Sequence, residues 1–328
     1  MKLLNKSFKK ILLILLLVLV FVTACSQIFN YKINLSSEKI KVSDCRVVQH
    51  QWGKTCVPKN PQRLIVIDED ILETVLALGI KPLATGEPNM GSLKKNLLID
   101  QPDEIISVGK QSQLNLEKIL QLHPDLIIGF EIDPSIYQLF SKIAPTVSLE
   151  YSQSGWKIAL QRMGEILQKS EIATQVLDQY EQRVSKLREA LGEKLHKITV
   201  SVSQFYPEMQ NLPEFRTKFS FPGSILKDIG LSFPKAQIQL TTNPKQTFIS
   251  VNLERVGLLD ADILFVALDT NSKSAYRSYY TNPLWQQLHV VQNKQVYTVD
   301  AVNWIFGNIF SANAILDDLF KYLINIQN

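Results

Sequence analysis

Two segments of the chain, 137 residues apart, repeat one pattern. Residues 115–128 read NLEKILQLHPDLII, and residues 252–265 read NLERVGLLDADILF. Asparagine is a favoured helix N-cap and glutamate suits the first turn, so each segment predicts a short helix that leads through an aspartate into a buried strand. A chance recurrence of this common pattern is the alternative. Because the copies hold comparable places in the two halves of the chain, we interpret them as two lobes of like architecture.

Strands alternate with helices around both copies. Residues 71–78 have a helical pattern that Gly79 ends, and residues 315–324 form a closing helix. The predicted strands are residues 63–68, 125–129 and 146–149 in the first half, and residues 197–202, 262–266 and 295–299 in the second. This alternation predicts an α/β fold with parallel sheets built from βαβ units.

A long helical stretch, residues 156–195, separates the two halves and contains no proline. A run of this length exceeds the usual helix, so we expect a break near Lys169 and Ser170. The predicted organisation is an N-terminal lobe (62–168), a rigid connecting helix (169–195) and a C-terminal lobe (196–328). A helix packed inside a single domain is the alternative.

The first residues have the pattern of an export signal. Four lysines precede an apolar run over residues 11–22, which is shorter than the ~20 residues of a membrane-spanning helix. The sequence VTAC at residues 22–25 resembles a lipobox, so we predict a lipoprotein signal peptide over residues 1–24, with Cys25 as the lipidation site. An ordinary cleavage site or an uncut membrane anchor is the alternative.

Residues 25–61 are expected to be a tether followed by a short hairpin. The mature chain would then be exported and lipid-anchored to the cell membrane, on the periplasmic or outer face. Cys45 and Cys56 remain after lipidation, and such a pair usually oxidises outside the cytoplasm, which favours a disulfide within the hairpin. Two free thiols are the alternative.

The charge balance gives no reason to expect nucleic acid as a partner. The full chain has 35 Lys+Arg and 31 Asp+Glu, but the four cations of the signal segment leave 31 of each in the mature chain. The sequence also lacks the Gly-x-Ser-x-Gly, Walker, Gly-x-Gly-x-x-Gly and His-Glu-x-x-His motifs. Its four histidines lie far apart, so neither an enzyme nor a receptor for bare metal is predicted.

Several stretches together resemble the periplasmic-binding-protein family that serves iron–siderophore, cobalamin and haem importers. They are residues 60–67 and 72–82, the two Asn-Leu-Glu segments, and residues 221–226, 282–285 and 315–319. The closest likeness, which includes residues 45–50, is to the ferric-siderophore branch. The resemblance implies two α/β lobes, a rigid connecting helix and a ligand cleft between the lobes.

The resemblance also implies a ligand and partners. The ligand would be a ferric siderophore, with the ferric ion carried only inside it and no cofactor of the protein's own. The partner would be an ABC permease dimer with its ATPase, on which one glutamate per lobe docks, here Glu117 and Glu254. Simple charge complementation at a helix N-terminus is the alternative role for both glutamates. We expect a monomer. The other functions considered are a haem or cobalamin receptor, a lipoprotein without a transport role, and an enzyme.

A ferric siderophore calls for aromatic walls and a few cationic or amide donors, which in α/β proteins lie on loops at the carboxyl ends of strands. By this rule the predicted ligand-binding residues are Lys110, Gln111, Phe130, Trp156, Tyr206, Arg216, Gln246, Arg277 and Trp304. Arg216 is flanked by apolar Phe215 and Phe219, which could hold its guanidinium toward an anionic ligand. For Arg216 the alternative is a surface arginine paired with Glu214. For Trp304 the alternative is a place in the core.

Overall fold

The computed structural model describes residues 45–87, 105–151, 155–206, 213–305 and 307–324. These residues belong to one compact unit, Asp44–Asn328. The predicted signal peptide, Cys25 and the tether lie outside the described residues. Among the helices that are described, none combines the length and the apolar character needed to cross a membrane.

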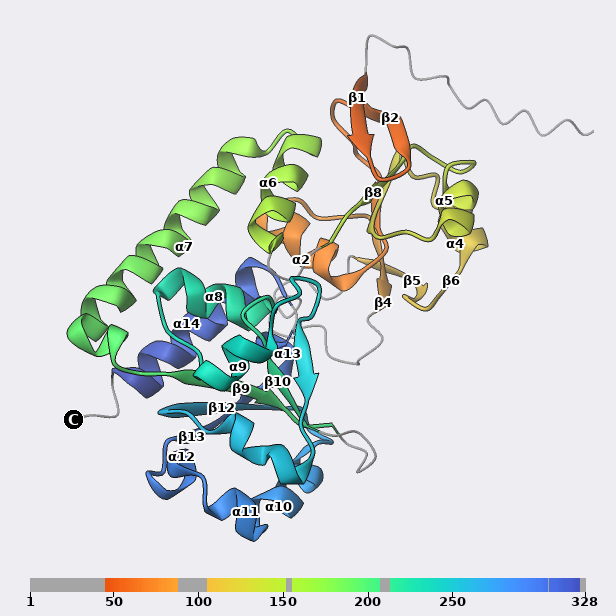
Figure 1. The fold of residues 1–328 in the computed structure, drawn as a ribbon. Helices are drawn as coiled ribbons and strands as arrows, with labels where there is room; N and C mark the ends of the chain where they lie inside the picture. Colours follow the sequence, from red (N-terminus) through yellow and green to blue (C-terminus); the bar gives the residue numbers. More distant parts are fainter. Residues whose placement is uncertain (1–44, 88–104, 152–154, 207–212, 306, 325–328) are drawn as a thin grey trace, which may run out of the picture. The chain divides into compact units, whose positions relative to one another are not determined.

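The first element is the predicted hairpin (Figure 1), in which β1 (Cys45–His50) pairs antiparallel with β2 (Gly53–Pro58). A disulfide joins Cys45 to Cys56, whose Cα atoms lie 5.5 Å apart. The hairpin contacts β8 (Thr146–Leu149), the last strand of the first sheet. The amide of Gln51 donates to the carbonyl of Ser148 (3.0 Å), and the hydroxyl of Thr55 to that of Thr146 (2.9 Å). The hairpin therefore satisfies carbonyls on the outer edge of that strand.

The N-terminal lobe is built on a six-stranded sheet of order β6-β5-β4-β3-β7-β8. Every neighbouring pair is parallel except β5 and β6. Its strands are β3 (Leu64–Val66), β4 (Ala84–Glu87), β5 (Ile106–Lys110), β6 (Gln113–Leu114), β7 (Leu126–Phe130) and β8. Its helices are α2 (Glu69–Ala77), α4 (Leu116–Gln121) and α5 (Pro134–Phe140).

The C-terminal lobe is built on a five-stranded sheet of order β11-β10-β9-β12-β13. The pairs β9–β12 and β12–β13 are parallel, whereas β10 runs antiparallel to both of its neighbours. The strands are β9 (Val200–Gln204), β10 (Glu214–Arg216), β11 (Phe248–Ser250), β12 (Ile263–Leu268) and β13 (Val296–Asp300). The helices are α8 (Phe221–Ile229), α9 (Lys235–Leu240), the 3-10 helix η4 (Leu253–Leu259), α10 (Lys273–Tyr280), α11 (Pro283–Gln286), α12 (His289–Gln292), α13 (Ala301–Trp304) and α14 (Ile309–Leu323).

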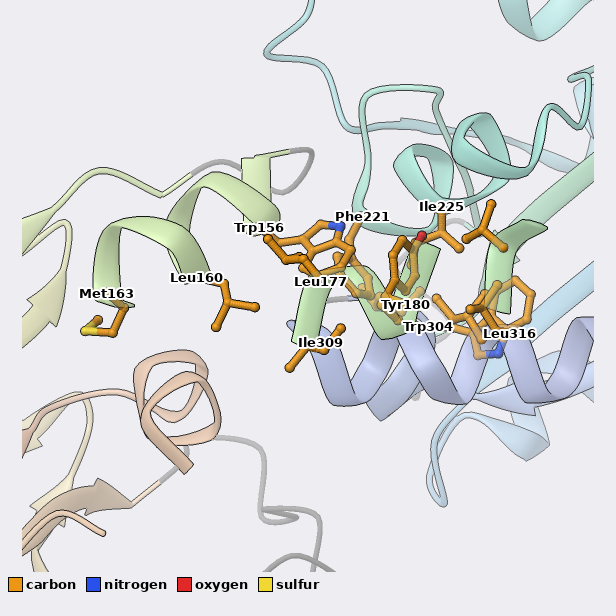
Figure 2. Close-up of a cluster of buried hydrophobic side chains, with 14 of the residues drawn as sticks. Trp156, Leu160, Met163, Leu177, Tyr180, Phe221, Ile225, Trp304, Ile309 and Leu316 are labelled. Atoms are coloured by element: carbon orange, nitrogen blue, oxygen red, sulfur yellow. The ribbon is translucent and has the colours of Figure 1, made fainter. Parts of the chain in front are cut away.

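Two helices link the sheets along the chain, α6 (Trp156–Ile166) and α7 (Ser170–Leu191), and the 3-10 helix η3 (Gly192–His196) follows. The predicted break at Lys169 and Ser170 is confirmed. One hydrophobic cluster runs from strands of the first sheet through α6 and α7 to strands of the second. Figure 2 shows part of it, with Trp156, Leu177, Tyr180, Phe221, Ile225 and Leu316 among the labelled side chains.

The repeated pattern has the same local structure in both lobes. Asn115 caps α4 by accepting from the amide of Lys118 (2.9 Å), and Asn252 caps η4 by accepting from that of Arg255 (3.1 Å). Farther along each copy, Asp125 accepts from the amide of Gln62 (2.6 Å), and Asp262 accepts from the amide of Thr199 (2.7 Å). Each aspartate thus binds the backbone 63 residues upstream, just before the first strand of its lobe.

The α/β fold with two parallel-sheet lobes is confirmed, with three corrections. The short strands β6, β10 and β11 add antiparallel pairs that the alternation did not predict, because strands of two or three residues leave little pattern in a sequence. The closing helix begins at Ile309, six residues earlier than predicted, because Asn308 caps it through the amide of Phe310. The segment after Asn252 is a 3-10 helix.

Candidate ligand-binding site

A group of polar side chains lies at the carboxyl end of β9 and on the adjacent β10; we call Gln204, Tyr206, Glu214 and Arg216 the Arg216 cluster. The guanidinium of Arg216 donates to Oε1 of Gln204 (2.5 Å), and its Nη1 lies 3.8 Å from a carboxylate oxygen of Glu214. The hydroxyl of Tyr206 donates to that same Glu214 oxygen (2.7 Å) and contacts Oε1 of Gln204 at 3.2 Å. These hydrogen bonds bring two of the predicted ligand-binding residues, Tyr206 and Arg216, into one network.

Strand alternation explains why this network forms. Glu214 stands opposite Gln204 in the β9–β10 pair, so both side chains lie on one face of the sheet, and Arg216 returns to that face two residues later. Phe215 points to the other face, where it is buried in a second hydrophobic cluster. The structure therefore corrects the loop position predicted for Arg216: it lies on a strand, and only 2% of the side chain is exposed.

Burial dominates the electrostatics of the cluster. Desolvation lowers the pKa of Arg216, and the nearby Tyr206 and Glu214 oppose that shift. Desolvation also raises the pKa of Glu214, against the hydrogen bond from Tyr206 and the charge of Arg216. Burying a cation and a carboxylate is costly, and the polar partners within the cluster offset part of that cost.

Phe248 is a neighbour of the cluster that the sequence did not single out. It stands directly opposite Arg216 in the β10–β11 pair, and its ring centroid lies 5.6 Å from the guanidinium carbon. The ring is 44% exposed although its partner is almost fully buried. Phe248 begins a three-residue edge strand, and only the strand register makes it a partner of Arg216.

A second group lies at the carboxyl ends of β3, β7 and β8. Asp68 is buried and accepts hydrogen bonds from the amides of Ile71 and Phe130, each at 2.9 Å. Desolvation raises the pKa of Asp68 to about 7, although both hydrogen bonds lower it. The rings of Phe130 and Tyr151 pack 5.0 Å apart. Desolvation and nearby carboxylates raise the pKa of Tyr151. Phe130, a predicted ligand-binding residue, is thus half-buried and packs against the half-buried Tyr151.

Two contacts connect the lobes beside this group. The Tyr151 hydroxyl reaches the carbonyl of Gly307 at 3.5 Å, and the side-chain amide of Asn308 donates to the carboxylate of Glu73. Both Glu73 and Asn308 are buried. The end of β8 and the helix α2 therefore lie against the turn that begins α14.

The other predicted ligand-binding residues lie in different surroundings. Lys110, Gln111 and Gln246 are exposed. Arg277 is also exposed, but it lies on helix α10, which corrects the polar loop predicted there. No hydrogen bond or ion pair links any of these four side chains to the Arg216 cluster among the contacts between described residues.

Two predicted aromatic residues lie in the core. Trp156 is 3% exposed and packs edge-on against Tyr180, with ring centroids 5.1 Å apart. Trp304 is fully buried against Phe265, and its indole N–H donates to Asp318 (2.8 Å). In this structure both tryptophans are packing residues, because apolar helices cover them, and neither presents a ring to a ligand.

The two predicted docking glutamates occupy equivalent positions in the two lobes. Glu117 and Glu254 each lie in the first turn after a capping asparagine, and both are exposed. The Glu117 carboxylate accepts only a long contact from Gln121, at 3.4 Å, among the hydrogen bonds of the described residues. Both carboxylates are therefore accessible to a macromolecular partner.

Comparison with known proteins identifies the family. Residues 64–302 match the family described as Periplasmic binding protein, and they span most of both lobes. The chain belongs to this family. Within the described residues no group of three or more histidine, cysteine, aspartate and glutamate side chains could hold a metal ion.

Individual relatives of this periplasmic binding protein cover most of the chain. The probable siderophore-binding lipoprotein YfiY of Bacillus subtilis (strain 168) is 31% identical over 332 residues, which cover 98% of this chain and 100% of the relative. The achromobactin-binding periplasmic protein of Dickeya dadantii (strain 3937) is 33% identical, with 80% of this chain and 86% of the relative covered. The crystal structure of Staphylococcus aureus SirA complexed with staphyloferrin B matches with a TM-score of 0.74 at 26% identity, over 85% of this chain and 98% of that one.

Proposed function

We propose that this chain is the lipid-anchored substrate-binding component of an ABC importer, and that it captures a ferric siderophore and delivers it to the membrane permease. The observation that carries the proposal is the match over 98% of the chain to a relative named as a probable siderophore-binding lipoprotein. The likeness to SirA, whose crystal structure holds staphyloferrin B, supports the same class of ligand.

The residues of the candidate site favour an anionic ligand in which the chelator fills the coordination sites of the metal. A siderophore occupies the coordination sites of the ferric ion, so its receptor supplies aromatic and cationic groups in place of metal ligands. Arg216 and Tyr206 in the C-terminal lobe, and Phe130 with Tyr151 in the N-terminal lobe, provide both kinds of group. We place the ligand between these two groups, in a cleft between the lobes.

Delivery and anchoring complete the proposal. Exposed carboxylates at equivalent positions of the two lobes, Glu117 and Glu254, suit a permease dimer that presents one cationic site per subunit. Cys25 supplies the lipid anchor. Cys25→Ala is expected to move the protein from the membrane fraction to the soluble fraction, as measured by immunoblotting of both fractions; retention in the membrane would contradict a lipid anchor.

Binding is tested by tryptophan fluorescence of the purified mature chain. Intact ferric siderophores of the citrate, hydroxamate and catecholate classes, together with haem and cobalamin, are titrated separately. Saturable quenching by a ferric siderophore, with the complex recovered unchanged, supports the proposal. Binding of haem or cobalamin alone would assign the chain to another ligand, and conversion of the complex would make it an enzyme.

Arg216→Ala is expected to weaken binding of an anionic ferric siderophore by ~1–3 kcal/mol, the usual effect of losing a hydrogen bond to a charged group. Arg255→Ala is the matched control, because Arg255 is exposed and is not among the predicted ligand-binding residues. Equal affinities of the two variants would remove Arg216 from the site and leave the receptor assignment in place.

A further inference from the structure

The environment of Arg216 poses a problem for a residue that binds an anion. The side chain is 2% exposed, so a ligand cannot reach the guanidinium in the arrangement that the structure shows. Strand β10 carries Phe215 into the core behind Arg216, and Gln204 and Glu214 flank it on its own face of the sheet. These three contacts are fixed by strand register and by core packing.

A further side of the guanidinium faces the ring of Phe248, whose centroid lies 5.6 Å from the guanidinium carbon. This ring belongs to β11, the outermost strand of the sheet, where it is paired on one side only. It is 44% exposed, whereas the neighbouring Phe215 is fully buried. A ring at a sheet edge with this much exposure can change rotamer without opening the core, because much of its surface already faces solvent.

We propose that Phe248 is a movable aromatic cover over Arg216, which turns aside when an anionic group of the ligand, such as a carboxylate, reaches the guanidinium. This inference rests on the proposed function and adds a specificity-determining residue to it. The ring and the guanidinium form a cation–π contact, which a carboxylate replaces with a stronger, charge-assisted hydrogen bond. A ligand without an anionic group makes no such exchange and leaves the cover closed.

The cover has a consequence for selectivity. A buried arginine beside a carboxylate attracts small inorganic anions less than an exposed arginine does, because Glu214 opposes their charge and Phe248 excludes them sterically. A large complex that also contacts aromatic groups elsewhere gains enough binding free energy to displace the Phe248 ring. The site thereby favours anionic complexes of siderophore size over free anions.

A chemical labelling experiment tests the cover without any ligand. Phenylglyoxal modifies accessible arginine side chains, and mass spectrometry of peptides reports the rate at each one. In the unaltered mature chain Arg216 is expected to react slowly and the exposed Arg277 quickly. Phe248→Ala is expected to raise the rate at Arg216 several-fold without changing the rate at Arg277, while Phe248→Tyr keeps the slow rate because it keeps the ring. An unchanged rate at Arg216 in Phe248→Ala would overturn the proposal.

A kinetic experiment tests whether the Phe248 cover affects ligand binding. It compares the association rates of ferric citrate, an anionic probe, and of a neutral ferric trihydroxamate. Phe248→Ala is expected to speed association of ferric citrate by about two- to fivefold, the equivalent of a lost cation–π contact of ~0.5–1 kcal/mol. Ile238→Ala, at another exposed apolar side chain, is the control. Equal association rates in Phe248→Ala and the unaltered chain would overturn the cover. If no ferric complex binds either chain while labelling still responds to Phe248→Ala, the cover stands and the proposed function falls.

Discussion

At the scale of single residues, the chemistry of both candidate groups depends on burial. Asp68 has two amide donors and Arg216 has two oxygen partners, yet desolvation is the largest influence on the pKa of each. The two groups sit at carboxyl ends of strands, where helix starts and edge strands limit the access of water. Similar side chains at exposed positions, such as Arg277, lack this environment.

Asp68 gives a pH prediction. Its pKa is raised from 3.8 to about 7 in the folded chain, so the folded state holds the proton more tightly than the unfolded state does. The stability it contributes is fully present below pH ~4 and is lost as the pH rises toward 7, by roughly 2–4 kcal/mol. Urea unfolding at pH 5 and pH 8 measures this difference. Asp68→Asn should flatten it, and an identical pH dependence in that variant would contradict the raised pKa.

At the scale of elements, the β1–β2 hairpin protects an exposed sheet edge. Besides its bonds to β8, the indole N–H of Trp52 donates to the carbonyl of Ile132 (2.8 Å), and the guanidinium of Arg46 donates to the carbonyl of Glu165 at the end of α6 (3.0 Å). Each of these two bonds joins residues at least 80 positions apart in the sequence. A two-stranded hairpin is marginal by itself, so the disulfide and these contacts hold it in place.

Replacing Cys45 and Cys56 together by serine is expected to loosen the hairpin. The disulfide restricts the unfolded segment between them, and the stability it adds is on the order of 2–3 kcal/mol for a loop of this size. Limited proteolysis of the mature chain should therefore cut near residues 51–55 much faster in the double variant. Val47→Ala, at an exposed position of the same hairpin, should leave the rate unchanged. Resistance equal to that of the unaltered chain would show that the hairpin holds without the disulfide.

At the scale of the whole molecule, a buried polar contact between Asn308 and Glu73 joins the two lobes. Asn308 accepts from the amide of Phe310 with its oxygen and donates to Glu73 with its nitrogen, so one side chain both starts α14 and contacts α2. The partners Glu73 and Asn308 are 235 residues apart in the sequence. A change at this position tests the contact between lobes separately from the helix cap.

Asn308→Asp keeps the capping oxygen but sets a second carboxylate against Glu73, so it is expected to destabilise the fold by roughly 2–4 kcal/mol. Glu73→Gln in the same chain supplies a donor and should recover most of that loss. Urea unfolding of both single variants and the double variant measures the coupling. Additive effects of the two substitutions would show that the pair does not interact.

The proposed docking on a permease is also a property of the whole molecule, because it involves both lobes. Glu117→Lys together with Glu254→Lys is expected to abolish uptake of radioactive iron and leave ligand affinity unchanged, since both carboxylates are exposed, one on α4 and the other on η4. Each single reversal should have a smaller effect. Normal uptake by the double variant, or loss of ligand binding in its place, would contradict the docking role.

The sequence by itself determined the features that local rules govern. The repeated Asn-Leu-Glu segments and their capped helices depend on hydrogen bonds between residues a few positions apart. Such bonds leave a pattern in the residue types. The hydrophobic runs of β7 and β12 likewise identify buried strands wherever they pair.

Only the tertiary structure decided which of the predicted ligand-binding residues lie together. Arg216 acquires its partners through two short antiparallel pairings, and the register that sets Phe248 opposite it depends on strands 32 residues apart in the chain. Trp156 and Trp304 entered the core because helices from distant segments cover them. Pairing and burial are long-range outcomes of packing, and the residue types near each position do not specify them.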